Sequence, residues 1–422
     1  MTESNPRRFR LGPGLLVTAA FIGPGTVVTA SKAGALYGPS LLWAVAFACL
    51  TTIAFQEMAA RIGIVSGQGL GQAIRKLIQS PALQFGIAAL IVVAILVGNA
   101  AYQTGNILGA ASGVEIFAQS SEASYFQPWI VGAIGAFAIV IIYLNKFSVL
   151  QNVLTGLVVL LSLLFLAAAA ISAPPISQIA SGLIPSVPKG SLWLLVAVLG
   201  TTVVPYNLFL HASLAATLWN DCKTDEQKSI AIRHSRIDTI LSVTLGGLVT
   251  AAIMLSGSAA FAEARAAGNA EASFSGVASI ATQLRPALGD LSSWLFGIGL
   301  FAAGLTSAIT APVAAGFAAA GCFGWPNKLT DWRVQAVAAA VVLIGVFAAI
   351  WMGGSPQQII ALAQVANGLL LPVLAIFILM IANQKELMSR YVNSKLFNTI
   401  AIAMIVVILL LALRQLKGGL GF

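Results

Sequence analysis

Charged side chains are scarce in this sequence of 422 residues. Asp, Glu, Lys and Arg together make up 8% of it, whereas hydrophobic residues make up 59%. A soluble domain carries about 25% charged residues. Apolar stretches of about 18 residues or more, the length that a bilayer core requires, recur along the whole chain. The composition therefore excludes an ordinary soluble domain and predicts an all-α integral membrane protein.

Residues that build disulfides, metal centres and catalytic sites are also few. The chain has three cysteines and two histidines. Cys49, Cys222 and Cys322 are too few and too scattered for a disulfide framework or a metal-binding motif. The sequence shows no nucleophile in a pattern with a base and an orienting group. We therefore predict that the protein is not an enzyme, has no transition-metal site and needs no cofactor apart from sodium as a coupling ion.

Eleven segments are apolar and long enough to be membrane spans. They cover residues 13–35, 39–62, 83–112, 128–145, 149–172, 191–216, 234–262, 290–320, 334–352, 357–383 and 396–414. The polar stretches between them are only of loop size, so residues 1–422 are predicted to form a single polytopic membrane domain.

The basic residues are distributed unevenly over the loops. If the N-terminus is cytoplasmic, 16 of the 22 Lys and Arg residues lie on the cytoplasmic side, five lie outside, and Lys32 lies within the first span. An excess of Lys and Arg marks cytoplasmic loops. The sequence therefore predicts an inner-membrane protein with its N-terminus in the cytoplasm and its C-terminus outside. The net charge of +9 reflects this topology, so no nucleic-acid partner is expected; the sequence indicates no oligomeric state.

Two of the spans are interrupted at mid-depth. The first contains FIGPGTVV (21–28), and the sixth contains GTTVVPYN (200–207). Proline costs a helix interior roughly 3 kcal/mol, and hydrocarbon offers no water to the backbone groups that it frees. Because the breaks are five spans apart, we predict an inverted 5+5 repeat: spans 1–5 over about 13–172, spans 6–10 over about 191–383, and span 11 at about 396–414. Paired breaks of this kind indicate a transporter with its binding site near the bilayer midplane.

The sequence around the breaks resembles a known family. The first, second and sixth spans of the NRAMP metal-ion transporters are similar to GPGLLVTAAFIGPGTVVTASKAGALYG, AFQEMAARIGIVSGQGLGQAIRK and TTVVPYNLFLHASL. The eighth and tenth are similar to LFAAGLTSAITAPVAAGF and AQVANGLLLPV. The resemblance covers nearly the whole chain. It implies a LeuT-like fold with broken spans 1 and 6 and a role in secondary active transport.

The residues that hold the metal in the family are missing. Metal-transporting members read Asp-Pro-Gly-Asn at the first break and Met-Pro-His-Asn in the sixth span. The matching positions here are Gly23, Pro24, Gly25 and Thr26, and Val204, Pro205, Tyr206 and Asn207. The site has thus lost its carboxylate and its thioether. Thr201 replaces the family's alanine, and Asn99 and Tyr102 replace the Asp and Glu of its proton path.

A site of this composition suits an anion. A divalent cation without a negatively charged ligand would be poorly compensated for its lost hydration. Two helix starts instead offer positive dipole ends and unpaired amides, and nearby hydroxyl and amide groups add donors. We predict bicarbonate, which both donates and accepts hydrogen bonds. The expected substrate-binding residues are Gly23, Pro24, Gly25, Thr26, Lys32, Asn99, Tyr102, Thr201, Thr202, Val204, Tyr206, Asn207 and Gln364.

Two other functions fit the same sequence. One is a divergent carrier of Mg²⁺ or Mn²⁺ whose ion keeps some of its water molecules. The other is a non-transporting sensor built on a transporter scaffold. Single residues also leave alternatives open. Lys32 either draws anions into the outer vestibule or extends to the lipid headgroups. Gln364 and Asn367 either close the site or join neighbouring helices.

Uptake of an anion against a negative-inside potential requires a coupled cation. A sodium site is expected from Gly23 and Thr26 of span one with Thr306, Ser307 and Thr310 of span eight; the alternative is that these hydroxyls bond across packed helices. Proton coupling would use His211 and Glu57. Glu57 equally has Arg61 four residues on, the spacing of an intrahelical ion pair. The expected partners are a small inorganic ion and the lipid bilayer.

Overall fold

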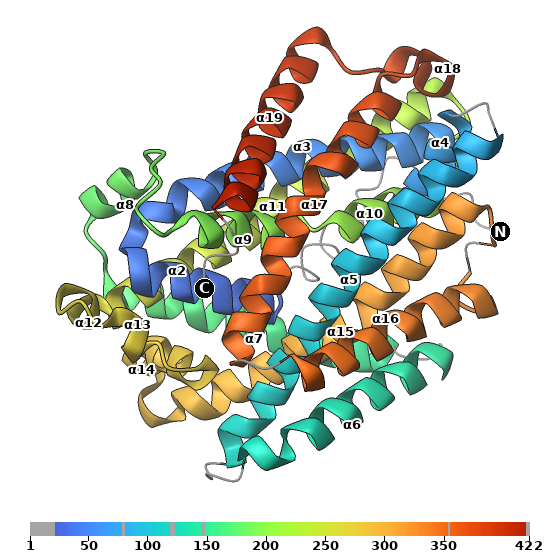
Figure 1. Ribbon diagram of the computed structural model, residues 1–422. Coiled ribbons are helices and arrows are strands. Elements are labelled where there is room, and N and C mark those ends of the chain that lie inside the picture. Colours follow the sequence, from blue (N-terminus) through green and yellow to red (C-terminus); the bar gives the residue numbers. More distant parts are fainter. Residues whose placement is uncertain are drawn as a thin grey trace.

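The computed structural model describes residues 22–77, 81–118, 123–144, 148–326, 328–352 and 355–418. Over these residues the chain forms α-helices and short 3-10 turns and contains no strand (Figure 1). The prediction of an all-α protein is confirmed. Residues 13–21, which open the first predicted span, lie outside the described part.

The predicted spans coincide with the long helices of the structure. These are α2 (Pro24–Tyr37), α3 (Leu42–Ser66), α5 (Pro81–Ala118), α6 (Ala123–Leu144), α7 (Ser148–Ser172), α9 (Leu192–Thr202) with α10 (Pro205–Leu218), α11 (Asp225–Ala260), α15 (Ser292–Phe323), α16 (Trp332–Trp351), α17 (Pro356–Ala382) and α19 (Lys395–Lys417).

Short helices occupy the connections between the spans. They are α4 (Leu70–Leu77), α8 (Ile176–Gly182), α12 (Ala262–Ala266), α13 (Ala270–Ser273), α14 (Arg285–Leu288) and α18 (Lys385–Met388). Within the described residues, nine stretches are long and apolar enough to cross a bilayer, and one of them contains both α2 and α3. The apolar part of α6, Pro128–Leu144, is shorter. With α2, α3 and α6 counted separately, the described residues contain a helix for each of the eleven predicted spans; the helix of the first span, α2, is described for 14 residues from Pro24.

A helix begins at each of the two prolines. α9 ends at Thr202, and α10 begins at Pro205 after Val204 in extended conformation (φ −83°, ψ 120°). α2 begins at Pro24 after Gly23, which is also extended (φ −113°, ψ −175°). Proline suits the first position of a helix because its missing N–H would have no partner there. The two prolines therefore start helices at the breaks rather than kinking continuous ones.

Small residues bring the central helices into close contact. α5 packs most extensively against α15, and α17 packs against both α5 and α9. A Cβ atom added at Gly200 of α9 would lie 1.9 Å from the carbonyl oxygen of Gln364 and 2.6 Å from the amide nitrogen of Gly368, both on α17. Backbones this close require glycine, as at many helix contacts in membranes. The contact fixes the end of α9, next to the break, against α17.

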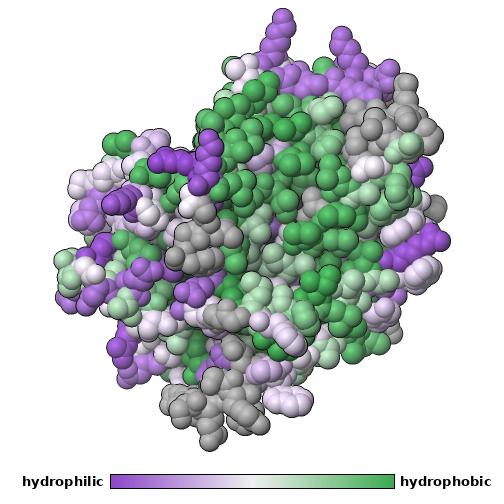
Figure 2. Space-filling view, in the orientation of Figure 1, coloured by the Kyte–Doolittle hydropathy of each residue, from purple (hydrophilic) through white to green (hydrophobic). Residues whose placement is uncertain are grey.

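The surface separates into an apolar band and polar ends. Figure 2 shows hydrophobic residues across the face formed by α17, α19, α5 and α16, with hydrophilic residues near α18 and around α12. Large apolar side chains are exposed on this band, for example Phe347, Trp351 and Leu410. A soluble protein would bury such a surface, whereas a membrane protein presents it to lipid.

Loops predicted to be cytoplasmic meet at one end of the molecule, which we call the basic pole: residues 61–70, 223–236 and 384–397. The Lys228 ammonium donates to the Val65 carbonyl at 3.1 Å, and the Tyr391 hydroxyl donates to the Asp225 carbonyl at 2.9 Å. Loops far apart in the sequence thus share one side, as the predicted topology requires. Arg7, Arg8, Arg10 and Lys146, also assigned to this side, lie outside the described residues.

We predict that Gly200→Ala destabilises the protein by about 1–3 kcal/mol, because the added methyl group would force α9 and α17 apart. The measurement is the thermal unfolding midpoint of purified protein in detergent. Gly132→Ala on α6 is the matched control, since a Cβ atom there meets nothing within 4 Å. Equal midpoints for the two variants would show that the α9–α17 contact is not tight.

Candidate ion-binding site

The starts of α2 and α10 are connected through one tyrosine of α5. The rings of Tyr102 and Tyr206 are in edge contact, with centroids 5.4 Å apart at an interplanar angle of 64°. A Cβ atom built on Gly23 would lie 3.5 Å from the Tyr102 hydroxyl oxygen and 3.9 Å from Oδ1 of Asn106. Tyr102 therefore lies between the two helix starts that the sequence predicts to form the site.

A hydrogen bond joins α2 directly to the end of α9. The hydroxyl groups of Thr26 and Thr201 are 2.7 Å apart, and both residues are fully buried. Thr202, the last residue of α9, donates its hydroxyl to the Val198 carbonyl, so this group is used within its own helix. The structure thus brings Thr26 and Thr201 together as predicted. The Thr202 hydroxyl donates its proton within α9, so that donor is not available to a ligand.

Gln364 of α17 covers the beginning of α2. A Cβ atom at Gly25 would lie 2.3 Å from its Nε2 atom, so only glycine lets the amide approach the backbone this closely. Nε2 donates to the Ile360 carbonyl at 3.4 Å, while Oε1 is buried without a partner. The amide therefore presents an acceptor near the first turn of α2, where backbone amides of a helix lack partners.

Buried polar atoms without a hydrogen-bond partner are concentrated around the breaks. Within the described residues they include the hydroxyls of Tyr102 and Tyr206, Oδ1 of Asn99, Nδ2 of Asn106, both amide atoms of Asn207, Oε1 of Gln364 and Nδ2 of Asn367. Most buried polar atoms in proteins are paired, and leaving one unpaired costs about 1–3 kcal/mol. A cluster of this size is the signature of a site for a polar ligand. We call it the ion-binding site.

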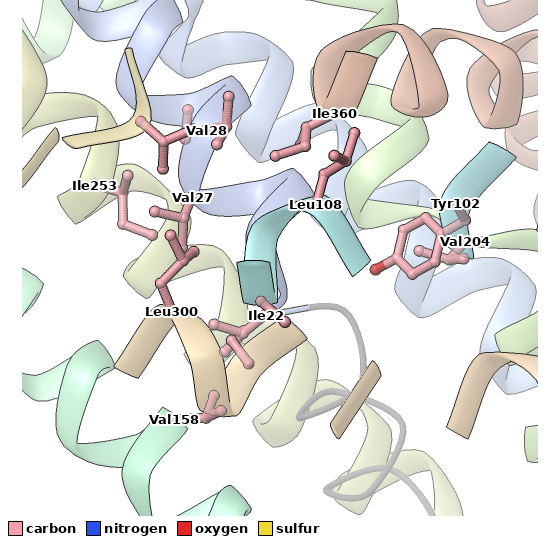
Figure 3. Close-up of a cluster of buried hydrophobic side chains, with 14 of the residues drawn as sticks. Ile22, Val27, Val28, Tyr102, Leu108, Val158, Val204, Ile253, Leu300 and Ile360 are labelled. Atoms are coloured by element: carbon pink, nitrogen blue, oxygen red, sulfur yellow. The ribbon is translucent and has the colours of Figure 1, made fainter. Parts of the chain in front are cut away.

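Apolar side chains surround this site. Figure 3 shows Val27 and Val28 of α2 together with Ile253 of α11 and Leu300 of α15, and Tyr102 near Val204. Val204 itself is 1% exposed. Apolar surroundings lower the local dielectric constant and strengthen the electrostatic effect of the two helix N-termini.

The site contains no acidic or sulfur-containing side chain. None of the residues named above is Asp, Glu, Cys or Met, and the described part of the chain has no group of three His, Cys, Asp or Glu residues that could hold a metal ion. The helix starts contribute partial positive charge. The ion-binding site is therefore neutral to positive.

The Lys32 side chain is buried and lies away from the break, beside an aromatic ring and an exposed carboxylate. It is 8% exposed, with the ammonium 4.8 Å from the centre of the Trp193 ring and 4.0 Å from Oε1 of Glu271. Glu271 is 82% exposed. The lysine is thus buried on the α13 side of α2, and a solvated carboxylate offsets part of its charge.

Two of the residues expected to bind sodium lie next to each other. Ser307 of α15 faces the break, since a Cβ atom on Gly23 would lie 3.1 Å from its Oγ atom. The Thr306 and Thr310 hydroxyls donate to the carbonyls of Ala302 and Thr306 in their own helix. A hydroxyl that donates its proton keeps the lone pairs with which its oxygen coordinates a cation, so these bonds leave both threonines in the predicted sodium site.

His211 and Glu57 do not form a relay with each other. His211 Nδ1 lies 3.2 Å from Oε1 of Gln56. Glu57, the next residue of α3, forms ion pairs with Arg61 at 3.1 Å and with Arg236 at 2.8 Å. The structure therefore gives Glu57 the intrahelical partner that the i, i+4 spacing predicts, and it adds a second arginine from α11.

Asn106 belongs to the site but was missed by the sequence analysis. It lies four residues after Tyr102 in α5, so both side chains project from the same helix face. Helical spacing from Tyr102 would have identified this position. Asn367, which the sequence analysis did consider, lies beside α5: its Oδ1 would be 3.1 Å from a Cβ atom on Gly98.

Broken helices that meet at a buried polar cluster, within a bundle of membrane-spanning helices, define the protein as a multi-pass secondary transporter. The chain belongs to the Nramp family: the family model described as natural resistance-associated macrophage protein-like matches residues 14–416. Members of this family are membrane transporters, which confirms that the protein is not an enzyme.

Curated relatives carry a more specific name. The chain is 30% identical over 402 residues to "Divalent metal cation transporter MntH 1" of Pseudomonas aeruginosa, covering 93% of this chain and 87% of the relative. It is 27% identical to "Divalent metal cation transporter MntH" of Yersinia enterocolitica, covering 96% and 94% of the two chains.

Solved structures agree on the fold. A mutant of the Eremococcus coleocola manganese transporter superimposes with a TM-score of 0.73 at 23% identity, covering 96% of this chain and 85% of that one. The transporter MhsT in complex with L-phenylalanine matches with a TM-score of 0.59 at 17% identity, covering 96% and 98% of the two chains. The predicted LeuT-like fold is thereby confirmed.

We predict that Tyr102→Phe lowers transport at least about tenfold while changing stability by no more than about 1 kcal/mol. The hydroxyl lies 3.5 Å from a Cβ atom built on Gly23, so its removal deprives the ion of a ligand without opening a cavity in the core. Ion flux into liposomes and thermal unfolding are the two measurements. Tyr143→Phe on α6, where the side chain is exposed, is the control. Unchanged flux in Tyr102→Phe would exclude this residue from the site.

Proposed function

We propose that the protein is an inner-membrane secondary transporter that imports a small inorganic anion, bicarbonate, together with a sodium ion. The observation that carries this proposal is the absence of acidic and sulfur-containing side chains from the ion-binding site. A naked divalent cation placed there would lose its hydration shell without meeting one formal negative charge. An anion faces the opposite situation, because two helix N-termini and several hydroxyl groups surround it.

Bicarbonate matches the mixture of donors and acceptors in the site. The hydroxyls of Tyr102 and Tyr206 and the Nδ2 group of Asn106 can donate to its oxygens. Its own O–H group can donate to an acceptor such as Oε1 of Gln364. A simple halide could use only the donors.

Sodium supplies the driving force in this proposal. Moving one negative charge inward costs about 2.3 kcal/mol per 100 mV of negative-inside potential, and a cotransported cation cancels that cost. Ser307 beside Gly23 gives sodium an oxygen ligand next to the substrate. The cytoplasmic position of the basic pole and of the N-terminus is part of the same proposal and rests on the positive-inside rule.

A divalent metal ion is the second candidate, and the comparisons favour it over the anion. The two curated relatives described above are both named divalent metal cation transporters. Mg²⁺ dehydrates reluctantly and is often held through its own water molecules. Water molecules could bridge such an ion to the amide oxygens of Asn207 and Gln364, which lack partners.

Flux into proteoliposomes separates the two candidates. With inward gradients of sodium and bicarbonate, we expect a saturable change of internal pH that stops when sodium is replaced by choline. External Mn²⁺ or Mg²⁺ should give no uptake in the same vesicles. Saturable metal uptake without a bicarbonate response would establish the second candidate, and binding without flux of either ion would indicate a sensor.

Introducing a negative charge at the first break tests the electrostatic argument. Gly23→Asp should reduce bicarbonate flux by at least about a hundredfold, because a carboxylate would then repel the anion in a site of low dielectric constant. Gly23→Asn has nearly the same shape without the charge and is the matched control; Val204→Met, combined with Gly23→Asp, restores the family's sulfur as well. If Asp and Asn reduce flux equally, the effect is steric and the electrostatic argument fails.

A further inference from the structure

A pocket at the basic pole plays no part in the proposed transport site. It has a volume of about 630 Å³ and lies among α3, α11 and the segment that leads into α19. One part of its lining is polar, with Glu57, Arg61 and Arg236, and another part is apolar, with Ile53 and Ile240. We call it the basic-pole pocket.

Two arginines and one glutamate set the charge of the pocket. The Glu57 side chain is 8% exposed and accepts from both Arg61 and Arg236. Arg61 directs two further donors at the Tyr391 carbonyl and at Oδ1 of Asn393. One carboxylate thus faces two guanidinium groups, and the pocket retains a net positive charge.

Arg236 is the group that remains available to a ligand. Its side chain is 53% exposed and donates to Glu57 through Nη2 alone in the described structure. The guanidinium therefore has further donors directed away from that pair. Arginine presents such donors as a planar fork that matches the oxygens of a phosphate group.

The start of α19 adds positive potential to the same pocket. Ser394 lines it and caps the helix by accepting from the Phe397 amide at 3.2 Å. α19 is 23 residues long, so its N-terminus carries the partial positive charge of a full helix dipole. The pocket thus combines a partly free arginine with a helix N-terminus.

The apolar part of the pocket continues onto the membrane-facing surface. Ile240 is 41% exposed, and Leu50 of α3, Leu241 of α11 and Ile400 of α19 are 58%, 61% and 42% exposed. Leu50 and Ile400 lie one helical turn from the lining residues Ile53 and Phe397, and Leu241 follows Ile240, so exposed apolar residues of the same three helices adjoin the pocket. A ligand that fits both parts has an anionic head and hydrocarbon chains.

We propose that the basic-pole pocket binds the phosphate group of an anionic glycerophospholipid, with Arg236 as the principal contact and the acyl chains over Ile240 and Leu50. Basic pockets between membrane helices on the cytoplasmic side recognise anionic headgroups in this way. Free inorganic phosphate shares the headgroup chemistry, but it would leave the apolar lining without a partner. Glu57 of α3 already forms an ion pair with Arg236 of α11. Bound lipid would add α19 to this contact.

Native mass spectrometry of the delipidated full-length protein tests this proposal with phosphatidylglycerol and phosphatidylcholine as probes. We expect the protein to retain phosphatidylglycerol preferentially and Arg236→Gln to reduce that retention at least tenfold. Arg233→Gln, which removes an exposed charge from the same helix outside the pocket, should retain lipid like the unmodified protein. Equal retention by the two variants, or no preference for the anionic lipid, would overturn the proposal.

A second pair of variants leaves the Glu57–Arg236 ion pair intact. Ser394→Asp preserves a good helix cap but places a carboxylate in the pocket, whereas Ser394→Asn caps the helix without charge. We expect retention of phosphatidylglycerol to be lost in the Asp variant and kept in the Asn variant, at equal unfolding midpoints. Displacement of the lipid by millimolar inorganic phosphate would identify the pocket as a site for soluble phosphate and refute the lipid as its ligand.

Discussion

The structure depends on one constraint: a backbone that stops being helical inside a bilayer must find partners for its polar groups. Pro24 and Pro205 meet this constraint by starting new helices, each with an N-terminus in the protein interior. Around them the chain places glycines where backbones touch and polar side chains where backbone groups are free. The ion-binding site is a consequence of this arrangement, because helix N-termini held in an apolar surrounding attract polar ligands.

This chain shares the fold of the Nramp family, but the residues at its two helix breaks differ from those of the metal-transporting members. The match over residues 14–416 and the superposition on a manganese transporter place the chain in the Nramp family. Yet the residues at the breaks are Gly23, Thr26 and Val204, which carry neither charge nor sulfur. The positions of the helices are thus shared with relatives that are named for divalent metals, while the electrostatics at the centre are not those of a site for a naked cation. Family membership and site chemistry therefore give separate information about the substrate.

Formal charge is concentrated away from the centre of the molecule. Glu57 forms ion pairs with Arg61 and Arg236 at the basic pole, and Lys32 lies next to Glu271, about two turns along α2 from the break. These buried charges have partners of opposite sign, which limits the cost of removing them from water. The pairs also connect segments distant in the sequence, so they stabilise the arrangement of the helices at the ends of the spans. The centre is left to neutral polar groups.

The sequence alone determined the elements and the places where they break, because bilayer thickness fixes the length of a span and proline fixes where a helix begins. It therefore predicted the eleven spans, the breaks before Pro24 and Pro205, and the Glu57–Arg61 pair, which depends only on helical spacing. Only the tertiary structure decided which side chains meet across helices. Arg236 as the second partner of Glu57, and the close approach of Gly200 to Gln364 and Gly368, depend on how each helix is rotated and how closely it packs. Those rotations come from the sum of many small-residue contacts between distant segments, and no local pattern in the sequence encodes them.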